Sequence, residues 1–245
     1  MRLCIDWGNS LVKAALYNAQ HTLAEQFSWP HEAAVTGIQE LVMRTTPKAA
    51  ILCSVTNHPA ALDTFLKEHT HFILLDQHTS LPIMNAYLSP ETLGADRLAM
   101  VVASHYDHPD KNNLVIALGT CITYNFISSN RTFRGGAISP GLKMRLQAMH
   151  HFTDKLPEVD SEGELLLLGY DTATCMRSGA VYGMAAEIHG MLQAYESEYP
   201  HFNAVLTGGD APFFARQLKN KIFAAPDLVL KGLYLILQHN VPNLR

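Results

Sequence analysis

Short apolar runs separated by polar turns recur along the chain. Leu3–Tyr17 contains two such runs around the polar turn DWGNS, a pattern that is typical of a β-hairpin. The apolar runs at Ala49–Val55 and Phe72–Leu75 predict two strands, and Pro59–His69 between them has the spacing of a helix. Strands and helices that alternate in this way indicate an α/β fold.

The next segment has helical spacing and ends in a region rich in turn residues. Ser89, Pro90 and Glu91 form a helix-start signal, and the helical pattern continues through Arg97–Tyr106. Residues 107–113 are rich in turn-forming types and end this pattern. We therefore place a domain boundary here, between residues 1–113 and residues 114–245.

The hairpin pattern of the N-terminus returns at Leu114. The segment LVIALGTCITYNFI aligns without gaps with LCIDWGNSLVKAAL, which starts at Leu3. This alignment places Gly119 on Gly8 and Thr120 on Asn9. The sequence therefore predicts a duplicated unit, although two glycine-turn hairpins can also resemble each other by chance.

The second half continues with further alternating elements. A glycine-rich corner, GGAISPG, precedes them. The predicted elements are helices over Leu142–His151, Thr174–Tyr195 and Leu228–Gln238, and a strand over Ala204–Leu206. Small residues at Gly179, Gly183 and Ala186 lie on one side of the second helix, where they predict close approach of a neighbouring helix.

The composition is that of a globular protein. The 245 residues are 48% hydrophobic and 16% charged, which excludes a disordered tail or a fibrous rod. The net charge of −4 has the wrong sign for a protein whose main partner is nucleic acid. No apolar run approaches the length of about 18 residues that a membrane span needs, and the N-terminus lacks a signal-peptide pattern. We expect a cytoplasmic protein without a membrane partner.

The cysteines and histidines do not indicate a metal or disulfide site. Cys4, Cys53, Cys121 and Cys175 lie far apart without a CxxC pair, so we expect small buried apolar residues in a reducing compartment. The 13 histidines are scattered and form no HExxH-type pattern.

Three glycine turns follow apolar strands, at Gly8, Gly119 and Gly208–Gly209. Each one exposes backbone N–H groups at a strand end, which is the geometry that binds a phosphate when several such turns face one cleft. Any single turn is more often an ordinary hairpin. Three turns, two of them related by the repeat, favour a nucleotide-phosphate cleft between two similar domains.

Several charged residues near these turns are candidates for chemistry. Asp6 ends a predicted strand and could hold magnesium, or it could cap its own turn. Lys13 could reach a phosphate or remain solvated. Asp96 and Arg97 stand at a predicted helix start, where a carboxylate can accept a hydroxyl proton and an arginine can bind a substrate carboxylate. A helix cap with a surface charge is the alternative for this pair.

Six segments taken together resemble one known family. They are DWGNSLVK, TLGADRLA, ALGTCITYNFI, GGAISPGLKMR, DTATCMRSGAVYG and LTGGDAPFF, and the match to which they belong runs from about residue 3 to residue 239. The chain resembles the type III pantothenate kinases of the acetate and sugar kinase/heat-shock chaperone/actin superfamily. The resemblance implies two similar ribonuclease H-like α/β domains with the actin-like ATPase fold, residues 1–113 and 114–245, and a nucleotide cleft between them.

The resemblance also implies an activity and a set of site residues. The family transfers the γ-phosphate of ATP to the hydroxyl of pantothenate, the first step of coenzyme A synthesis, and its members are homodimers. The matching residues that bind ATP are Asp6, Gly8, Asn9, Ser10, Lys13, Gly119 and Thr120, with Mg²⁺ at Asp6. Asp96 matches the proposed catalytic base, and the matching residues that hold pantothenate are Tyr87, Gly94, Ala95, Arg97 and Thr172.

Two positions depart from the family pattern. Ala117 and Asn125 stand where the family has acidic residues, the first of which usually holds an activating monovalent cation, K⁺ or NH₄⁺. An alanine methyl cannot coordinate a cation, and an asparagine offers only a neutral carbonyl oxygen. We therefore expect an activity that depends less on potassium than is usual in the family.

Two alternatives remain open at this stage. The first keeps the kinase fold but changes the acceptor to a sugar or another small hydroxyl compound. The second is a nucleotide-binding regulatory or scaffold protein that has lost catalysis, which the missing acids at positions 117 and 125 suggest. A shared fold does not decide between them.

Overall fold

The computed structural model describes residues 1–199, 201–218 and 222–242. The chain forms two compact units. Unit 1 comprises Met1–Pro109, Ile127–Arg134 and the C-terminal segment from Asp227, and unit 2 comprises Asp110–Phe126 and Gly135–Pro226. The predicted domains, 1–113 and 114–245, were divided at the turn-rich residues 107–113, and they stay a prediction.

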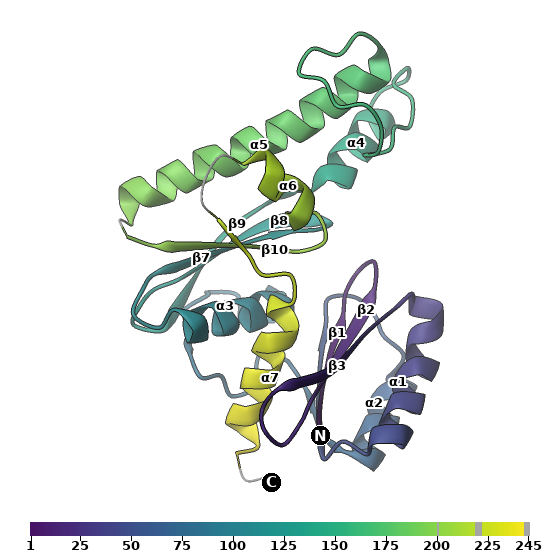
Figure 1. The fold of residues 1–245 in the computed structure, drawn as a ribbon, viewed down its shortest axis with the longest axis vertical. Coiled ribbons are helices and arrows are strands. Elements are labelled where there is room, and N and C mark those ends of the chain that lie inside the picture. The colour runs from purple at the N-terminus through teal and green to yellow at the C-terminus, as the bar shows by residue number, and fades with distance from the viewer. Residues whose placement is uncertain (200, 219–221, 243–245) are drawn as a thin grey trace. The chain divides into compact units, whose positions relative to one another are not determined.

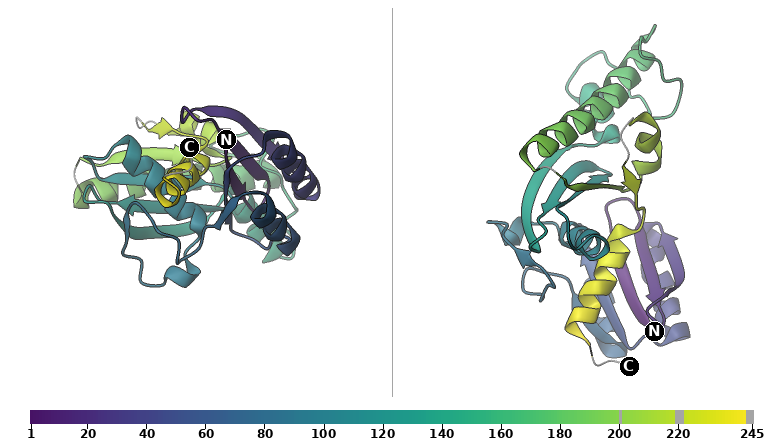
Figure 2. Two further views of the ribbon diagram at one scale, coloured as in Figure 1. Left: turned by 90° about the horizontal axis from the view of Figure 1, so that it is seen from below. Right: turned by 60° about the vertical axis from the view of Figure 1, so that its left-hand side comes forward.

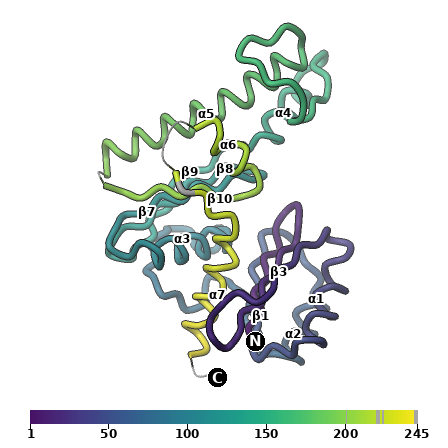
Figure 3. The backbone as a smooth tube through the Cα atoms, in the orientation of Figure 1, coloured from purple at the N-terminus to yellow at the C-terminus, as the bar shows by residue number. Residues whose placement is uncertain are grey.

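The first sheet belongs to unit 1. Its strands are β1 (Arg2–Trp7), β2 (Val12–Tyr17), β3 (Leu23–Trp29), β4 (Ala49–Ser54) and β5 (His71–Leu74). They lie in the order β3-β2-β1-β4-β5, with antiparallel pairs among the first three strands and parallel pairs from β1 to β4 and from β4 to β5. Figure 3 traces the predicted β1–β2 hairpin, which the structure confirms.

Helices cover both faces of this sheet. On one face lie α1 (His31–Thr45) and α2 (Ala60–His69), and on the other lie α3 (Ala95–Asp107) and α7 (Leu228–Asn240) (Figures 1 and 2). Because successive side chains of a strand point to opposite faces, Leu3 and Ile5 pack with α1 and α2, whereas Cys4 packs with α3 and α7. A sheet buried on both sides explains why the middle of β1, Leu3–Ile5, is apolar at every position.

The second sheet repeats the arrangement of the first. Its strands are β7 (Asn113–Leu118), β8 (Cys121–Ile127), β9 (Thr132–Pro140), β10 (Asn203–Thr207) and β11 (Phe223–Ala224), and the two-residue strand β6 (Met84–Asn85) is added at the β9 edge. The order is β11-β10-β7-β8-β9-β6, and its first five strands match β5-β4-β1-β2-β3. The parallel pairs also correspond, because β7 pairs with β10 and β10 with β11. This equivalence confirms the predicted duplication of an α/β unit.

The helices of unit 2 are α4 (Leu142–His151), α5 (Thr172–Glu198) and α6 (Ala211–Gln217). The long helix α5 crosses one face of the second sheet (Figure 1). Buried side chains of α5, such as Met184 and Ile188, pack with Leu114 and Ile116 of β7 in one core cluster. Among the described residues, no helix combines the length and the apolarity that a membrane span would need.

The helix-start signal at Ser89 does not begin the α-helix. Pro90–Thr92 forms only one turn of 3₁₀ helix, and Leu93 and Gly94 then adopt extended ψ angles of 122° and 125°. The helix α3 begins one residue later, at Ala95. This prediction was wrong in its start, and the break matters because it places Gly94 directly before the helix.

Two expectations about buried small residues also fail. Cys4 and Cys53 are buried, but Cys175 is exposed on α5. It shares its face of the helix with Gly179 and Gly183, where an added Cβ would meet no heavy atom within 4 Å. The predicted close packing of this stripe therefore has no partner within the described chain.

Candidate active site

Asp6 lies at the end of β1 in unit 1, between two neighbouring strands. It pairs in register with Lys13 on β2 and with Cys53 on β4. The residue is only partly exposed, and burial raises the pKa of its carboxyl to about 7. The negative charge of Asp96 adds to this rise, whereas Lys13 lowers the pKa. The surroundings of Asp6 therefore bring the pKa of its carboxyl close to neutral pH.

Asp96 is the second residue of α3 and faces the same environment. Burial raises the pKa of its carboxyl, although the N–H of Arg97, the Arg97 guanidinium and its own N–H act in the opposite direction. The Cys53 thiol is also close to both acids, because Asp6 and Asp96 each add to the rise that burial causes in its pKa. Unit 1 thus brings the two predicted acids together.

The acid pair fits a magnesium ion. Two carboxylates that repel each other are stabilised by a cation, and Mg²⁺ prefers oxygen ligands. Within the described part of the chain, no group of three or more His, Cys, Asp or Glu residues could hold a metal ion. Magnesium commonly completes its coordination with water and substrate phosphate oxygens, so one or two carboxylates are enough.

Gly94 leaves room for the Asp96 carboxylate. A Cβ atom at Gly94 would lie 2.6 Å from Oδ1 of Asp96. This distance is much shorter than a van der Waals contact, so a larger residue at position 94 would displace the carboxylate. Gly94 therefore fixes where the acid points.

Arg97 is held against two aromatic rings in unit 1. The residue is 4% exposed, and its guanidinium carbon lies 5.5 Å from the ring centroid of Tyr87 and 5.8 Å from that of Phe133. These are cation–π distances. The short strand β6 (Met84–Asn85) pairs with Thr132 and Phe133, and the N–H of Tyr87 donates to Oδ1 of Asn85 at 3.1 Å. The predicted partners Arg97 and Tyr87 therefore lie together.

Phe133 and Asn85 were not predicted as part of this site. Phe133 is fully buried. Its contact with the Arg97 guanidinium joins residues far apart in the sequence. Only the aromatic type and the position just before the GGAISPG segment were visible in the sequence.

The first glycine turn exposes its polar tip. The N–H of Gly8 donates to the carbonyl of Leu11 at 3.2 Å, which closes the turn. Asn9 and Ser10 are exposed at the tip, and Lys13 is partly exposed on the strand that follows. The arrangement leaves these polar groups available to a ligand.

The second glycine turn, in unit 2, is closed by a hydrogen bond that spans one residue fewer. The N–H of Gly119 donates to the carbonyl of Cys121 at 3.1 Å, and Gly119 and Thr120 are exposed. An added Cβ at Gly119 would meet no heavy atom within 4 Å. No neighbouring side chain or backbone therefore requires a glycine at this position.

The third glycine turn packs against Leu118, the last residue of β7. Gly208 has a φ of 96°, and a Cβ there would lie 2.2 Å from the carbonyl oxygen of Leu118. The N–H of Asp210 also donates to this carbonyl, at 3.2 Å. Within unit 2, the second and third turns therefore lie at the same end of the sheet.

Thr172 is exposed at the first position of α5. The Asp171 carboxylate caps this helix by accepting the N–H of Thr174 at 2.8 Å. This cap fixes the helix start and therefore the place of Thr172.

A pocket of about 830 Å³ lies beside the start of α3. Gly94 and Ala95 line it, together with parts of residues 54–57, 75–78 and 90–93 and with Leu98, whereas Asp6 and Asp96 do not. The predicted pantothenate residues Gly94 and Ala95 thus border this pocket, whereas Asp96, which follows them on α3, does not line it.

The two positions that depart from the family pattern carry no charge. Ala117 carries only a methyl group. Asn125 is fully buried, and its Nδ2 donates to the Val115 carbonyl at 3.2 Å and to Oγ1 of Thr123 at 3.0 Å. Asn125 thus serves the packing of β7 and β8.

Comparisons with known proteins identify the class. The sequence model of the type III pantothenate kinase family matches residues 2–194. A type III pantothenate kinase of Bacteroides fragilis (strain YCH46) is 42% identical, over 98% of each chain. This protein belongs to the type III pantothenate kinase family, as its sequence motifs indicated.

Solved structures agree with this fold. A Baf family protein from Campylobacter jejuni has a TM-score of 0.64 at 22% identity, over 99% of this chain and 100% of that chain. The ROK hexokinase of Thermus thermophilus has a TM-score of 0.55 at 13% identity, over 98% and 99%. The actin-like α/β fold class is confirmed. The curated relatives give no support to a regulatory or scaffold protein without catalysis.

Replacing Asp6 by Asn is expected to stabilise the protein at alkaline pH. The folded-state pKa of about 7 exceeds the usual value of 3.8, so the stability that protonated Asp6 contributes is complete below pH 4 and is lost as the pH rises through 7. Thermal unfolding without Mg²⁺ should show a higher melting temperature for Asp6→Asn than for the wild type at pH 8, and a smaller difference at pH 5. Asp110→Asn, at an exposed aspartate, controls for the lost charge. An equal gain at both pH values would contradict the account.

Replacing Gly94 by Ala is expected to lower turnover while leaving the fold intact. The new methyl group meets the end of the Asp96 side chain rather than backbone, so the carboxylate moves and the helix stays. A displaced base can cost on the order of 100-fold in kcat. Steady-state kinetics and thermal unfolding measure the two effects. Normal turnover in a folded Gly94→Ala variant would show that the position of Asp96 is unimportant.

Proposed function

We propose that this protein transfers the γ-phosphoryl group of ATP to the primary hydroxyl of pantothenate, the first step of coenzyme A synthesis. Membership of the type III pantothenate kinase family supports the reaction. The single structural observation that carries the proposal is the approach of Asp6 and Asp96 in unit 1. Asp6 is the proposed ligand of the metal ion, and Asp96 is the proposed acceptor of the hydroxyl proton.

The ATP phosphates are assigned to the two hairpin turns. In unit 1 these are Gly8, Asn9, Ser10 and Lys13, and in unit 2 they are Gly119 and Thr120. Exposed N–H groups, hydroxyls and an ammonium group are donors to phosphate oxygens. Mg²⁺ at Asp6 supplies neutralisation of the phosphate charge when it is bound.

Asp96 is the proposed base. It accepts the proton of the attacking hydroxyl, and the pKa that burial raises brings it closer to neutral pH, where a general base is most efficient. Phosphoryl transfer requires little covalent chemistry from the protein, so positioning and charge neutralisation supply most of the rate.

Arg97 supplies the positive charge for the pantothenate carboxylate. Its guanidinium presents a planar set of donors that match a carboxylate, and the rings of Tyr87 and Phe133 limit its freedom. Gly94 and Ala95 border the start of the same helix in unit 1, and Thr172 of unit 2 is a further proposed pantothenate residue.

The location of the protein in the cytoplasm, which the sequence predicted, stays a prediction.

We also propose a homodimer, supported by the exposed face of α5. This face carries mainly small residues, including Cys175, Gly179, Gly183, Ala186 and Gly190, and it begins at Thr172. Small residues allow two helices to approach closely.

Replacing Gly183 by Glu is therefore expected to convert a dimer into a monomer. An added side chain at this position meets nothing in the described chain, so the subunit itself should remain folded. Light scattering after size-exclusion chromatography measures the mass. A variant that keeps the mass of a wild-type dimer would exclude this face as the interface.

A coupled assay of ADP release tests the reaction. ATP, Mg²⁺ and pantothenate should give ADP release, and a panel of sugars should not. Asp96→Asn should lower kcat by roughly 100-fold or more with little change in ATP affinity, since it removes the base. Nucleotide binding without ADP release would exclude the kinase.

The same assay tests the dependence on potassium. Because Ala117 offers no ligand for a cation, adding K⁺ should change the rate only slightly. A steep K⁺ requirement would contradict the prediction that position 117 holds no cation.

A further inference from the structure

Glu187 joins three segments of unit 2 through one carboxylate. It lies on α5, and its Oε1 accepts the hydroxyl of Tyr124 at 3.0 Å. Its Oε2 accepts the hydroxyl of Ser139 at 3.0 Å and forms an ion pair with Arg145. The carboxylate therefore links α5 to β8, to the end of β9 and to α4.

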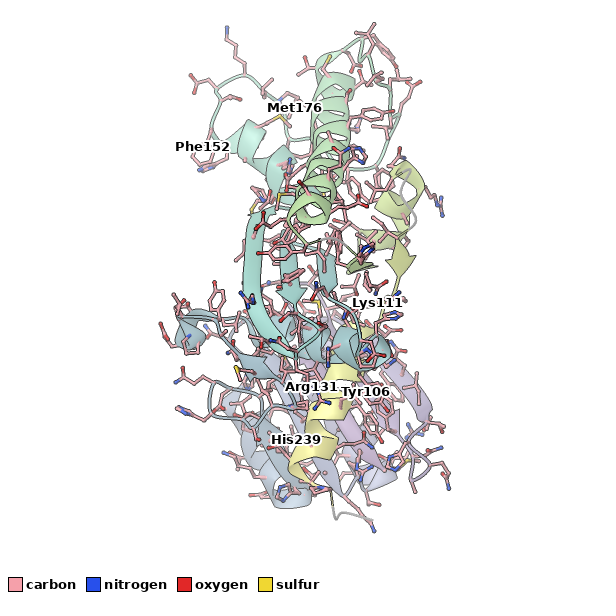
Figure 4. The ribbon with its side chains drawn as sticks, turned by 90° about the vertical axis from the view of Figure 1, so that its left-hand side faces the viewer. Tyr106, Lys111, Arg131, Phe152, Met176 and His239 are labelled. Carbon is pink, nitrogen blue, oxygen red and sulfur yellow. The ribbon has the colours of Figure 1, made fainter. Side chains whose placement is uncertain are left out.

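Arg145 holds the end of β9 at the same time. Its Nε donates to the carbonyl of Pro140 at 2.8 Å, and its Nη2 donates to the Ser139 hydroxyl at 2.9 Å. Its backbone N–H donates to the carbonyl of Gly141 at 3.0 Å. Figure 4 shows α4, which ends beside the labelled Phe152, next to α5, which carries Met176. The ion pair between these helices fixes residues 139–141.

Gly141 transmits this constraint to the second glycine turn. Its N–H donates to the carbonyl of Thr120 at 3.1 Å. A Cβ at Gly141 would lie 2.0 Å from the carbonyl oxygen of Gly119, so the two backbones are in direct contact. Because this contact leaves no free space, a shift of Gly141 must move Gly119 and Thr120 as well.

The burial of the ion pair makes it suited to positioning. The side chains of Arg145 and Glu187 are 22% and 26% exposed, whereas those of Arg44 and Glu25, another arginine–glutamate pair, are 55% and 39% exposed. Exposed pairs contribute little and lose geometry to solvent. A partly buried carboxylate with three donors is held in one orientation, because each donor would lose its partner if the carboxylate moved.

We propose that Glu187 and Arg145 are positioning residues that hold the Gly119–Thr120 turn in the shape that receives the ATP phosphates. The inference rests on the proposed function, which assigns this turn to ATP. Neither side chain needs to touch the nucleotide. The ion pair acts through Gly141, whose backbone contacts the backbone of Gly119 and Thr120.

The test measures ATP affinity separately from stability. Glu187→Gln keeps the shape and one carbonyl acceptor but removes the charge that pairs with Arg145. Calorimetric titration with ATP and Mg²⁺, without pantothenate, should show a Kd raised about tenfold, while the KM for pantothenate stays within about twofold of the wild type. Arg145→Met should have a similar effect, and the double variant should not be additive, because both changes break the same interaction.

Two further variants keep the result interpretable. Glu25→Gln breaks the exposed ion pair with Arg44 in unit 1 and should leave ATP affinity unchanged. Arg145→Lys keeps the charge but loses the fork of donors, so it should give an intermediate Kd even if Glu187→Gln folds poorly. A lower melting temperature of Glu187→Gln and Arg145→Lys without a change in ATP affinity would overturn the proposal, since the ion pair would then stabilise the fold without positioning the turn.

The turn itself is tested by Gly119→Ala and Thr120→Val. The methyl group at Gly119 has free space in the protein, so a weaker ATP affinity would show that the nucleotide approaches there. If these variants weaken ATP binding and Glu187→Gln does not, the positioning role is wrong and the proposed function stands. If none of them changes ATP affinity, the assignment of ATP to this turn is wrong and the positioning role falls with it.

Discussion

The repulsion between Asp6 and Asp96 is the constraint on which the rest of the site depends. One carboxylate ends β1 and the other begins α3, and each is surrounded by protein. Burial and mutual repulsion both favour a proton or a cation at Asp6. Lys13 on the adjacent strand offsets part of this cost at Asp6, and the backbone N–H groups at the start of α3 lower the pKa of Asp96. The free protein therefore holds a charge arrangement that a metal ion and phosphate would complete.

Glycines shape the site in two different ways. At Gly94 and Gly141 a side chain would collide with a group that has a proposed role, the Asp96 carboxylate and the Gly119 backbone respectively. At Gly119 a side chain would collide with nothing in the protein itself. Contacts within the structure thus account for Gly94 and Gly141, whereas no contact among the described residues accounts for Gly119. The sequence placed Gly119 in a turn and Gly141 in a glycine-rich corner, and the resemblance placed Gly94 beside pantothenate, but the atoms that surround each glycine are set by the fold.

The sequence predicted the repeated hairpins and the long helices because their apolar patterns are strong. It missed β3 and α1 for physical reasons. The edge strand β3 has no fully buried residue. The helix α1 begins after Pro30 without a side-chain cap, and the residue that follows its last turn, Thr46, is a non-glycine residue with a φ of 41°. In the site, the motifs indicated Asp6, Asp96 and Arg97. They could not indicate Phe133 or Glu187, whose roles come from contacts between segments distant in the sequence.

The central claim is that Asp96 faces the hydroxyl to be phosphorylated while Asp6 serves the metal. A crystal structure with pantothenate, Mg²⁺ and a non-hydrolysable ATP analogue tests it most directly. The account predicts the primary hydroxyl within about 3 Å of the Asp96 carboxylate and the metal ion on the Asp6 side of the acid pair. A hydroxyl placed away from Asp96, with another side chain in hydrogen-bonding contact with it, would contradict the account.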